Sequence, residues 1–182
     1  MAEALSPETL ALLQAAQFAA RAHRSQVRKD GQTPYASHPF RVCLIVRHVF
    51  GIDDPQALTA ALLHDTIEDT TTDFDDLEET FGADVARGVA ALSKDSRLAY
   101  DEREAAYMRA LAAADWRVKV CKLADMLDNI LDSAYLAPRA RQRSVKKLRG
   151  YLDAIRTNLP DIVARPCDIV TAHLEQMAAA AS

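Results

Sequence analysis

The segment His64–Asp69 carries four ionisable side chains, those of His64, Asp65, Glu68 and Asp69, directly after the mainly apolar run 57–63. A helix that is apolar nearly all round is normally buried, and buried charge is costly unless it is paired or bound to a metal ion. In one continuous helix, His64 and Glu68 would lie about 40° apart, as would Asp65 and Asp69, so all four would share an arc of about 140°. This pattern predicts a cluster that holds a cation and positions water.

A metal ion needs more ligands than His64 and Asp65 supply, since stable sites have about four. His38 and Asp125 are the best candidates to complete the set. Taken alone, His38 could be a residue of a helix start, and Asp125 could belong to a solvent-facing stripe of the helix 115–131. Two imidazoles and two carboxylates favour Mn²⁺, Fe²⁺ or Zn²⁺ over Ca²⁺. We expect a single ion, because no acid adjoins the remaining histidines, His23, His48 and His173.

Glu68 and Asp69 are the candidates for chemistry on a water molecule. Most acidic residues face solvent or cap helix starts, but a pair at the end of an apolar helix opposes the helix dipole. That local cost indicates a function, in which the two carboxylates orient water, take its proton and protonate a leaving oxygen. Arg28, Lys29 and Lys94 are, one by one, ordinary surface cations. Together, in loops that flank the acidic site, they could balance the charge of a phosphate substrate.

The sequence pattern predicts that the elements positioning these residues are helices. Ser6-Pro7-Glu8 has the pattern of a helix start, and the helix then runs to about His23. A loop with Gly31 and Pro34 leads to a second helix from His38 to about Val49. The further helices expected are one after Pro55, short ones ending at Phe81 and about Leu92, then 98–113, 115–131, 138–158 and a last one from Pro160. No strand-like alternation is present, so the sequence predicts one all-α domain.

Composition limits the class of protein and its partners. The chain has 182 residues, of which 49% are apolar and 6% aromatic, and this suits a packed helical protein. The formal net charge of −4 gives no indication of DNA, RNA or anionic membrane binding. Cys43, Cys121 and Cys167 form no CxxC pair and are expected to be reduced and buried. Because the sequence shows no export signal or membrane-spanning run, we expect a cytoplasmic protein.

Several motifs occur in a fixed order along most of the chain: Phe18–His23, Arg28–Gly31, Pro34–Pro39, Ala60–Thr70, Phe81-Gly82, Leu92–Asp95 and Lys122–Asn129. With them the chain resembles the HD superfamily of metal-dependent phosphohydrolases. More narrowly, it resembles the hydrolase domain of the RelA/SpoT family, in the small stand-alone form that hydrolyses alarmone nucleotides. The resemblance implies a single HD-domain helical bundle over residues 1–182, with the last helix, about 161–178, packing on it.

The resemblance also implies roles for particular residues. It implies one Mn²⁺ held by His38, His64, Asp65 and Asp125. It assigns the hydrolytic step to Glu68 and Asp69. The implied reaction removes pyrophosphate from the ribose 3′ position of guanosine tetra- or pentaphosphate (ppGpp or pppGpp), giving GDP or GTP. The implied substrate contacts are Arg28, Lys29, Lys94, Asn129, Lys147 and Tyr151.

Two alternatives stay open on the sequence. The same fold and metal could act on another nucleotide, such as the 2′-phosphate of NADPH. A protein of another class, a nucleotide-binding module without catalysis, could keep the fold, although the intact Glu68-Asp69 pair argues against it. No synthetase domain is recognisable, so we expect hydrolysis without synthesis, and the sequence indicates no particular oligomeric state.

Overall fold

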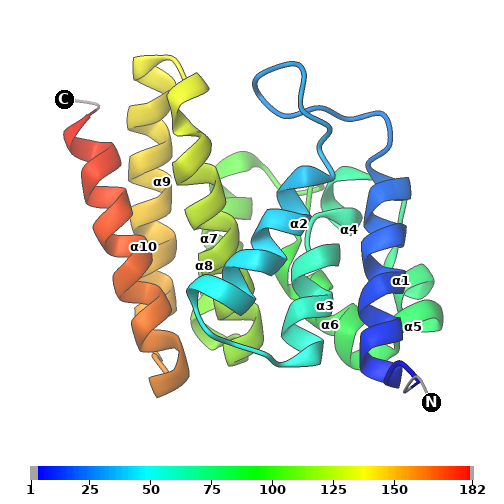
Figure 1. The fold of residues 1–182 in the computed structure, drawn as a ribbon. Coiled ribbons are helices and arrows are strands. Elements are labelled where there is room, and N and C mark those ends of the chain that lie inside the picture. The colour runs from blue at the N-terminus through cyan, green and yellow to red at the C-terminus, as the bar shows by residue number, and fades with distance from the viewer. Residues whose placement is uncertain (1–3, 181–182) are drawn as a thin grey trace.

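Within residues 4–180, which the computed structural model describes, the regular secondary structure is helical (Figure 1). The one strand-like feature in that range is an isolated antiparallel bridge between Val27 and Pro34. The predicted all-α fold is thus confirmed. The α-helices are α1 (Pro7–Ala22), α2 (Ser37–Leu44), α3 (Pro55–Leu63), α4 (Thr66–Asp69), α5 (Phe74–Phe81), α6 (Ala83–Leu92), α7 (Tyr100–Ala113), α8 (Trp116–Leu131), α9 (Pro138–Arg156) and α10 (Asp161–Ala179). The predicted domain bounds, 1–182, include residues 1–3 and 181–182, which lie outside the described range.

Capping side chains fix several helix starts where the sequence predicts them. Ser6 accepts a hydrogen bond from the backbone N–H of Thr9, and Asp73 and Asp76 form a reciprocal capping box at the start of α5. The second predicted helix, to about Val49, is observed as α2 followed by a π-helical turn, Ile45–Val49. The positions at which these helices begin and end determine which helix ends lie next to one another.

Helix α8 lies at the centre of the bundle. It packs against α2, α3, α6 and α10, and α10 also packs against α9 (Figure 1). Its stripe of Lys122, Asp125 and Asn129 faces the interior rather than solvent, because Tyr107 of α7 and Tyr151 of α9 lie beside Lys122. The solvent-facing reading of this stripe is therefore wrong, and the polar side chains of α8 are available to an internal site.

The segment 57–69 is two helices rather than one. Helix α3 ends at Leu63, residues 64–65 form a turn, and α4 begins at Thr66. Side chains compete for the carbonyl groups at this end: Thr66 Oγ1 donates to the Leu63 carbonyl at 2.7 Å and His64 Nδ1 donates to the Ala61 carbonyl at 2.9 Å. The expected arc of four side chains on one helix is therefore wrong, and Glu68 and Asp69 belong to a separate short helix.

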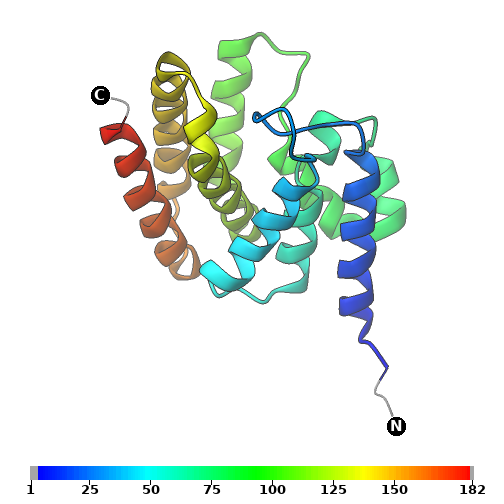
Figure 2. The ribbon, with the colours of Figure 1, turned by 45° about the horizontal axis from the view of Figure 1, so that its top comes forward.

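The loop 24–36 lies at the end of the bundle where α2 and α4 begin (Figure 2). Gln26 Nε2 donates to the Asp69 carbonyl at 2.6 Å, so the loop is tied to α4. Within the loop, Asp30 accepts hydrogen bonds from the backbone N–H groups of Gln32 and Thr33, which closes a tight turn around Gly31, whose φ is +73°. The loop thus covers the end of the bundle that carries the acidic cluster.

A buried cation ties the C-terminal ends of α7 and α9 together. Lys119 of α8 is 1% exposed, and its Nζ donates to the carbonyls of Ala112, Ile155 and Asn158 at 3.1, 3.4 and 2.5 Å. Burial lowers the pKa of Lys119. Helix C-termini favour a nearby positive charge, and this explains how an ammonium group is accommodated here among carbonyls.

Two further observations concern the helices and the cysteines, whose expected burial holds for Cys121 and Cys167 but not fully for Cys43. No helix in residues 4–180 is long and apolar enough to cross a membrane. Cys43, Cys121 and Cys167 are free thiols; Cys121 and Cys167 are buried, and Cys43 is half-buried.

Asp54 is predicted to be a local determinant of stability. It caps α3 by accepting the Ala57 N–H at 2.9 Å, and it forms a bidentate pair with Arg117 at 2.8 and 2.9 Å. We expect Asp54→Ala to lower the free energy of unfolding by about 1 to 2 kcal/mol in urea titrations at pH 7. The matched control is Asp53→Ala, an exposed neighbour, for which the change should stay within about 0.5 kcal/mol.

The contribution of Asp54 to the free energy of unfolding should depend on pH. The hydrogen bond from Arg117 lowers the pKa of Asp54, although burial opposes it. A carboxyl group with a lowered folded-state pKa contributes stability that is present above the unfolded value, near 4, and is lost as pH falls through the folded value. The difference between wild type and Asp54→Ala should therefore be constant near neutrality and shrink in acid. An equal difference at pH 7 and below pH 3 would contradict this explanation.

Candidate active site

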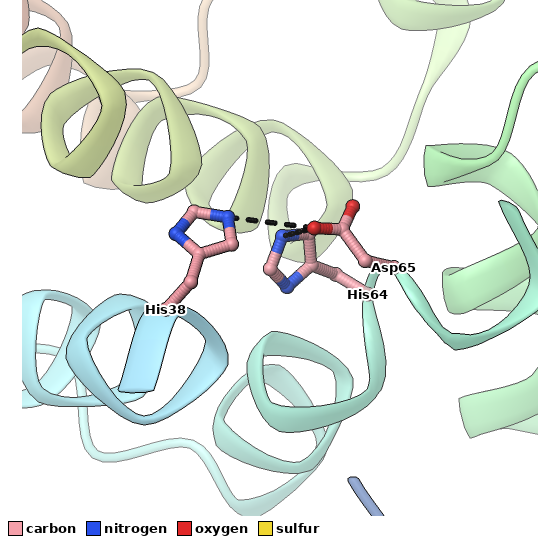
Figure 3. A group of neighbouring side chains, drawn as sticks. All are labelled: His38, His64 and Asp65. Atoms are coloured by element: carbon pink, nitrogen blue, oxygen red, sulfur yellow. Dashed lines mark ion pairs between the residues drawn. The ribbon is translucent and has the colours of Figure 1, made fainter. Parts of the chain in front are cut away.

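Three side chains that could bind a metal ion converge between α2 and the turn after α3 (Figure 3). His38 comes from the first turn of α2, and His64 and Asp65 form the turn that follows α3. One ligand atom from each lies within 4.8 Å of the others. Asp65 Oδ2 is 3.4 Å from His38 Nε2 and 3.0 Å from His64 Nε2, so the carboxylate faces both imidazoles.

Asp125 of α8 reaches the same place. Its Oδ1 lies 3.2 Å from His38 Nε2 and 3.9 Å from His64 Nε2. Two neighbours on α8 hold its carboxylate: Lys122 Nζ lies 2.8 Å from Oδ2, and Asn129 Nδ2 donates to Oδ1 at 2.6 Å. The structure therefore brings together all four residues that the sequence suggests as ligands.

The hydrogen bonds of both histidines leave one ring nitrogen available to a metal ion. His38 Nδ1 lies 2.6 Å from Asp128 Oδ2, and His64 Nδ1 lies 2.9 Å from the Ala61 carbonyl. Carbonyl and carboxylate oxygens accept only, so each Nδ1 carries a proton, and each Nε2 is the ring nitrogen left to offer a lone pair when a metal ion takes the place of any proton on it. His64 Nε2 is buried and makes no well-aligned hydrogen bond, although Asp65 Oδ2 lies 3.0 Å away. Two Nε2 atoms and two carboxylates form a donor set for a divalent metal ion.

The charges of the cluster also favour the binding of a cation. Burial opposes the protonated form of His38, but hydrogen bonds to Asp125, Asp128 and Asp65 outweigh it and raise its pKa to about 10. Burial would likewise raise the pKa of Asp125, but Lys122 and His38 hold it below its usual range. Carboxylates this close together need positive charge between them, and a metal ion supplies it directly.

Glu68 and Asp69 lie on α4, next to the metal-binding cluster. Glu68 Oε2 accepts the backbone N–H of Lys94 at 3.0 Å. The hydroxyl of Tyr35 lies 3.2 Å from Asp69 Oδ2 and 2.6 Å from Asp65 Oδ2, so it links the two acids. Burial raises the pKa of both Glu68 and Asp69. Carboxyl groups with raised pKa values are suited to exchanging protons near neutral pH.

A group of cations and aromatic rings lies on the other side of Asp125. The Nζ atoms of Lys94 and Lys122 lie 5.0 to 5.3 Å from the ring centroids of Tyr107 and Tyr151. Glu104 pairs with Lys94 Nζ at 3.0 Å and accepts a short hydrogen bond from the Tyr151 hydroxyl. Two ammonium groups beside a metal-binding cluster are suited to neutralising phosphate charge.

The remaining predicted substrate contacts differ in their surroundings. Lys147 is exposed and lines a cavity of about 490 Å³ together with Tyr151, and it lines a smaller one of about 240 Å³ together with Lys29. Arg28, by contrast, is buried in ion pairs, and Asn129 is engaged by Asp125. The structure thus groups Lys94, Lys147 and Tyr151, whereas Arg28 and Asn129 are held by protein contacts.

Sequence reasoning missed some of the residues that shape this site. Asp128 contacts His38. It lies three residues after Asp125 on α8 and four residues before Asp132, just past the end of α8, so the helical spacing could have revealed it. Tyr35 and Glu104 gave no comparable signal, because their partners are distant in the chain. His23 is buried against Tyr35, with ring centroids 4.8 Å apart, and His48 is exposed, as expected for histidines outside the cluster.

Comparison with known proteins identifies the class to which this fold and cluster belong. The model of the HD domain family matches residues 15–150. A crystal structure of lmo0812 from Listeria monocytogenes EGD-e superposes with a TM-score of 0.67 and 26% identity, covering 79% of this chain and 95% of that one. The chain therefore belongs to the HD domain family.

Within this family, the chain is similar to hydrolases related to SpoT. A protein of Danio rerio named guanosine-3′,5′-bis(diphosphate) 3′-pyrophosphohydrolase MESH1 is 39% identical over 167 residues, which cover 85% of this chain and 93% of that protein. The Homo sapiens protein of the same name is 45% identical over 129 residues, which cover 70% of this chain and 72% of that protein. A solved structure described as a metazoan ortholog of SpoT that hydrolyzes ppGpp has a TM-score of 0.83 and 32% identity, with 96% and 98% coverage. These likenesses make this chain an HD-domain hydrolase.

Proposed function

We propose that this chain hydrolyses guanosine 3′,5′-bis(diphosphate) and the corresponding pentaphosphate, releasing pyrophosphate and GDP or GTP, with Mn²⁺ as its metal ion. The observation that carries the proposal is the cluster of His38, His64, Asp65 and Asp125, with Glu68 and Asp69 beside it. It occurs in a chain that is 39% identical to a hydrolase named for this reaction over nearly that protein's whole length.

In this proposal the four clustered residues are the ligands of the ion. When bound, the ion supplies Lewis-acid activation of water and neutralises phosphate charge. The tautomers of His38 and His64 present Nε2 lone pairs to it, and Lys122 and Asn129 hold the Asp125 carboxylate in place. A mixed set of imidazole and carboxylate ligands suits Mn²⁺.

Glu68 and Asp69 carry the proton transfers. One carboxylate takes a proton from the attacking water, and a carboxyl group protonates the ribose 3′ oxygen as pyrophosphate leaves. Burial raises the pKa values of both, which favours such exchange. Their hydrogen bonds to Lys94 and Tyr35 fix their positions on the short helix α4. Positioning of this kind accounts for much of the benefit of an acid or base next to a reacting group.

The substrate's phosphates are proposed to contact Lys94, Lys147 and Tyr151, on the side of the cluster formed by α7 and α9. Lys29, at the rim of the neighbouring small cavity, is proposed to contact the nucleotide. Arg28 and Asn129 remain predicted substrate contacts, but each reaches the substrate only if it gives up or shares the protein contacts described above. A cytoplasmic location forms part of the same proposal and agrees with the free thiols.

The expected result for the purified protein is release of pyrophosphate and GDP from guanosine tetraphosphate. Turnover should stop when a chelator removes the metal and return when Mn²⁺ is added, because the buried ligands alone provide no electrophile. The measurement is product quantification by anion-exchange chromatography, with a panel of other nucleotides that includes NADPH.

The outcomes separate this proposal from its alternatives. Faster release of phosphate from another nucleotide would favour the other-substrate alternative. Tight nucleotide binding without turnover under any divalent metal would favour a binding module. ATP-dependent formation of guanosine tetraphosphate would contradict a purely hydrolytic enzyme.

A further inference from the structure

Asp128 is a buried carboxylate that is not among the proposed ligands. It lies on α8, one helical turn after Asp125, and is 0% exposed. His38 Nδ1 lies 2.6 Å from its Oδ2, Arg28 Nη2 lies 3.1 Å from the same oxygen, and Arg41 Nε lies 2.6 Å from Oδ1. One carboxylate therefore joins a metal-binding histidine, the loop 24–36 and α2.

Two guanidinium groups lie against this carboxylate. A buried carboxylate is costly to ionise unless cations accompany it, and Arg28 and Arg41 supply two. An ionised carboxylate accepts hydrogen bonds and cannot donate them, so the shared proton belongs to His38 Nδ1. The Nε2 of His38, on the far side of the ring, is then the nitrogen that faces Asp65 and Asp125, where a metal ion would bind.

We propose that Asp128 is a positioning residue that fixes the ring orientation and tautomer of His38 for metal binding. The inference rests on the proposed role of His38 as a metal ligand. A carboxylate behind a coordinating histidine also strengthens the donor power of its Nε2. Arg28 and Arg41 act through Asp128, because they hold its carboxylate against His38. This arrangement gives the buried Arg28 a function within the protein that does not require contact with the nucleotide.

The chain offers a matched control about one turn beyond Asp128, just past the end of α8. Asp132 accepts hydrogen bonds from Arg28 Nε and Nη2 at 2.9 and 2.6 Å, and Arg41 Nη1 lies 3.5 Å from it. Within residues 4–180, the side-chain hydrogen bonds and ion pairs of Asp132 go to these two arginines. A change at Asp132 therefore disturbs the same ion-pair network without removing the partner of His38.

The experiment compares Mn²⁺ affinity in calorimetric titrations of wild type, Asp128→Ala, Asp128→Asn and Asp132→Ala. Asp128→Ala should weaken Mn²⁺ binding by about 10- to 100-fold, the usual effect of losing a partner behind a metal ligand. Asp128→Asn keeps an acceptor oxygen for His38 and should recover part of that loss. Asp132→Ala should stay within about threefold of wild type, because it removes a partly exposed ion pair.

Equal losses for Asp128→Ala and Asp132→Ala would overturn the proposal, as would an Asp128→Ala affinity within about threefold of wild type. If Asp128→Ala fails to fold, the wild-type protein decides the question. In zinc-loaded protein labelled with ¹⁵N-histidine, His38 should show a protonated, slowly exchanging Nδ1 and a metal-bound Nε2. Coordination through Nδ1 would refute the inference. Wild type that binds no divalent metal would instead refute the proposed metal site.

Discussion

Loss of tight metal binding is the expected result of His64→Ala. His64 is buried, its Nδ1 is committed to the Ala61 carbonyl, and its Nε2 points at Asp65 without a well-aligned hydrogen bond. Removing the imidazole takes away one of about four ligands and leaves a gap beside two carboxylates. The loss of affinity should exceed the roughly 10- to 100-fold that removal of an outer hydrogen-bond partner costs. Elemental analysis and calorimetric Mn²⁺ titration measure it.

The same loss is expected for Asp125→Ala, because Asp125 is the proposed ligand on the central helix α8. His48→Ala is the matched control: it removes an exposed imidazole that lies outside the cluster, and metal content should not change. Unchanged metal content in both His64→Ala and Asp125→Ala would move the metal site elsewhere. Equal losses in all three variants would point to a general effect on folding.

Glu68→Gln and Asp69→Asn should each lower kcat by about 10²- to 10⁴-fold, the usual range for a positioned acid or base. The amide side chains keep the shape of the acids and can still accept the hydrogen bonds from Lys94 and Tyr35, but they cannot exchange a proton. Metal content and the unfolding midpoint should barely change. Nucleotide affinity should stay the same or rise, because a negative charge near the phosphates is lost.

Steady-state kinetics of metal-reconstituted protein test this, with Glu79→Gln as a control at an exposed acid of α5. Near-native kcat in both variants would return Glu68 and Asp69 to a capping role on α4. Loss of metal with loss of activity would make them ligands. A fall in kcat at constant metal content, with KM unchanged or lower, is the combination that supports proton transfer.

Much of the fold follows from signals within a few residues of each other. Ser6 and Asp73 cap helices where their types predict it, and Gly31 allows the tight turn of the loop. The clustering of His38, His64, Asp65 and Asp125 could also be predicted from the sequence, because buried acids and histidines at helix ends need a partner. These predictions succeeded because each depends on local geometry or on the cost of burying charge. The role of the four clustered residues as metal ligands stays a prediction.

The remaining features depend on contacts across the chain. Arg28 looks like a free surface cation in sequence, but its partners lie about a hundred residues away on α8 and just beyond it. Tyr35 acquires its role only because the loop folds back onto α4. The Lys122 stripe reads as solvent-facing until α7 and α9 are placed beside it. No periodicity within one helix can reveal such neighbours.

The turn at residues 64–65 also limits where insertions and deletions can occur in related chains. Every residue from Ala57 to Leu63 is buried, so an insertion within α3 would rotate the following turn by about 100° and move His64 and Asp65 away from His38. The segment 95–99 between α6 and α7 is largely exposed and lacks this constraint. Insertions and deletions among related chains should therefore gather in such segments, whereas the distance along the chain from Ala57 to Asp69 stays constant.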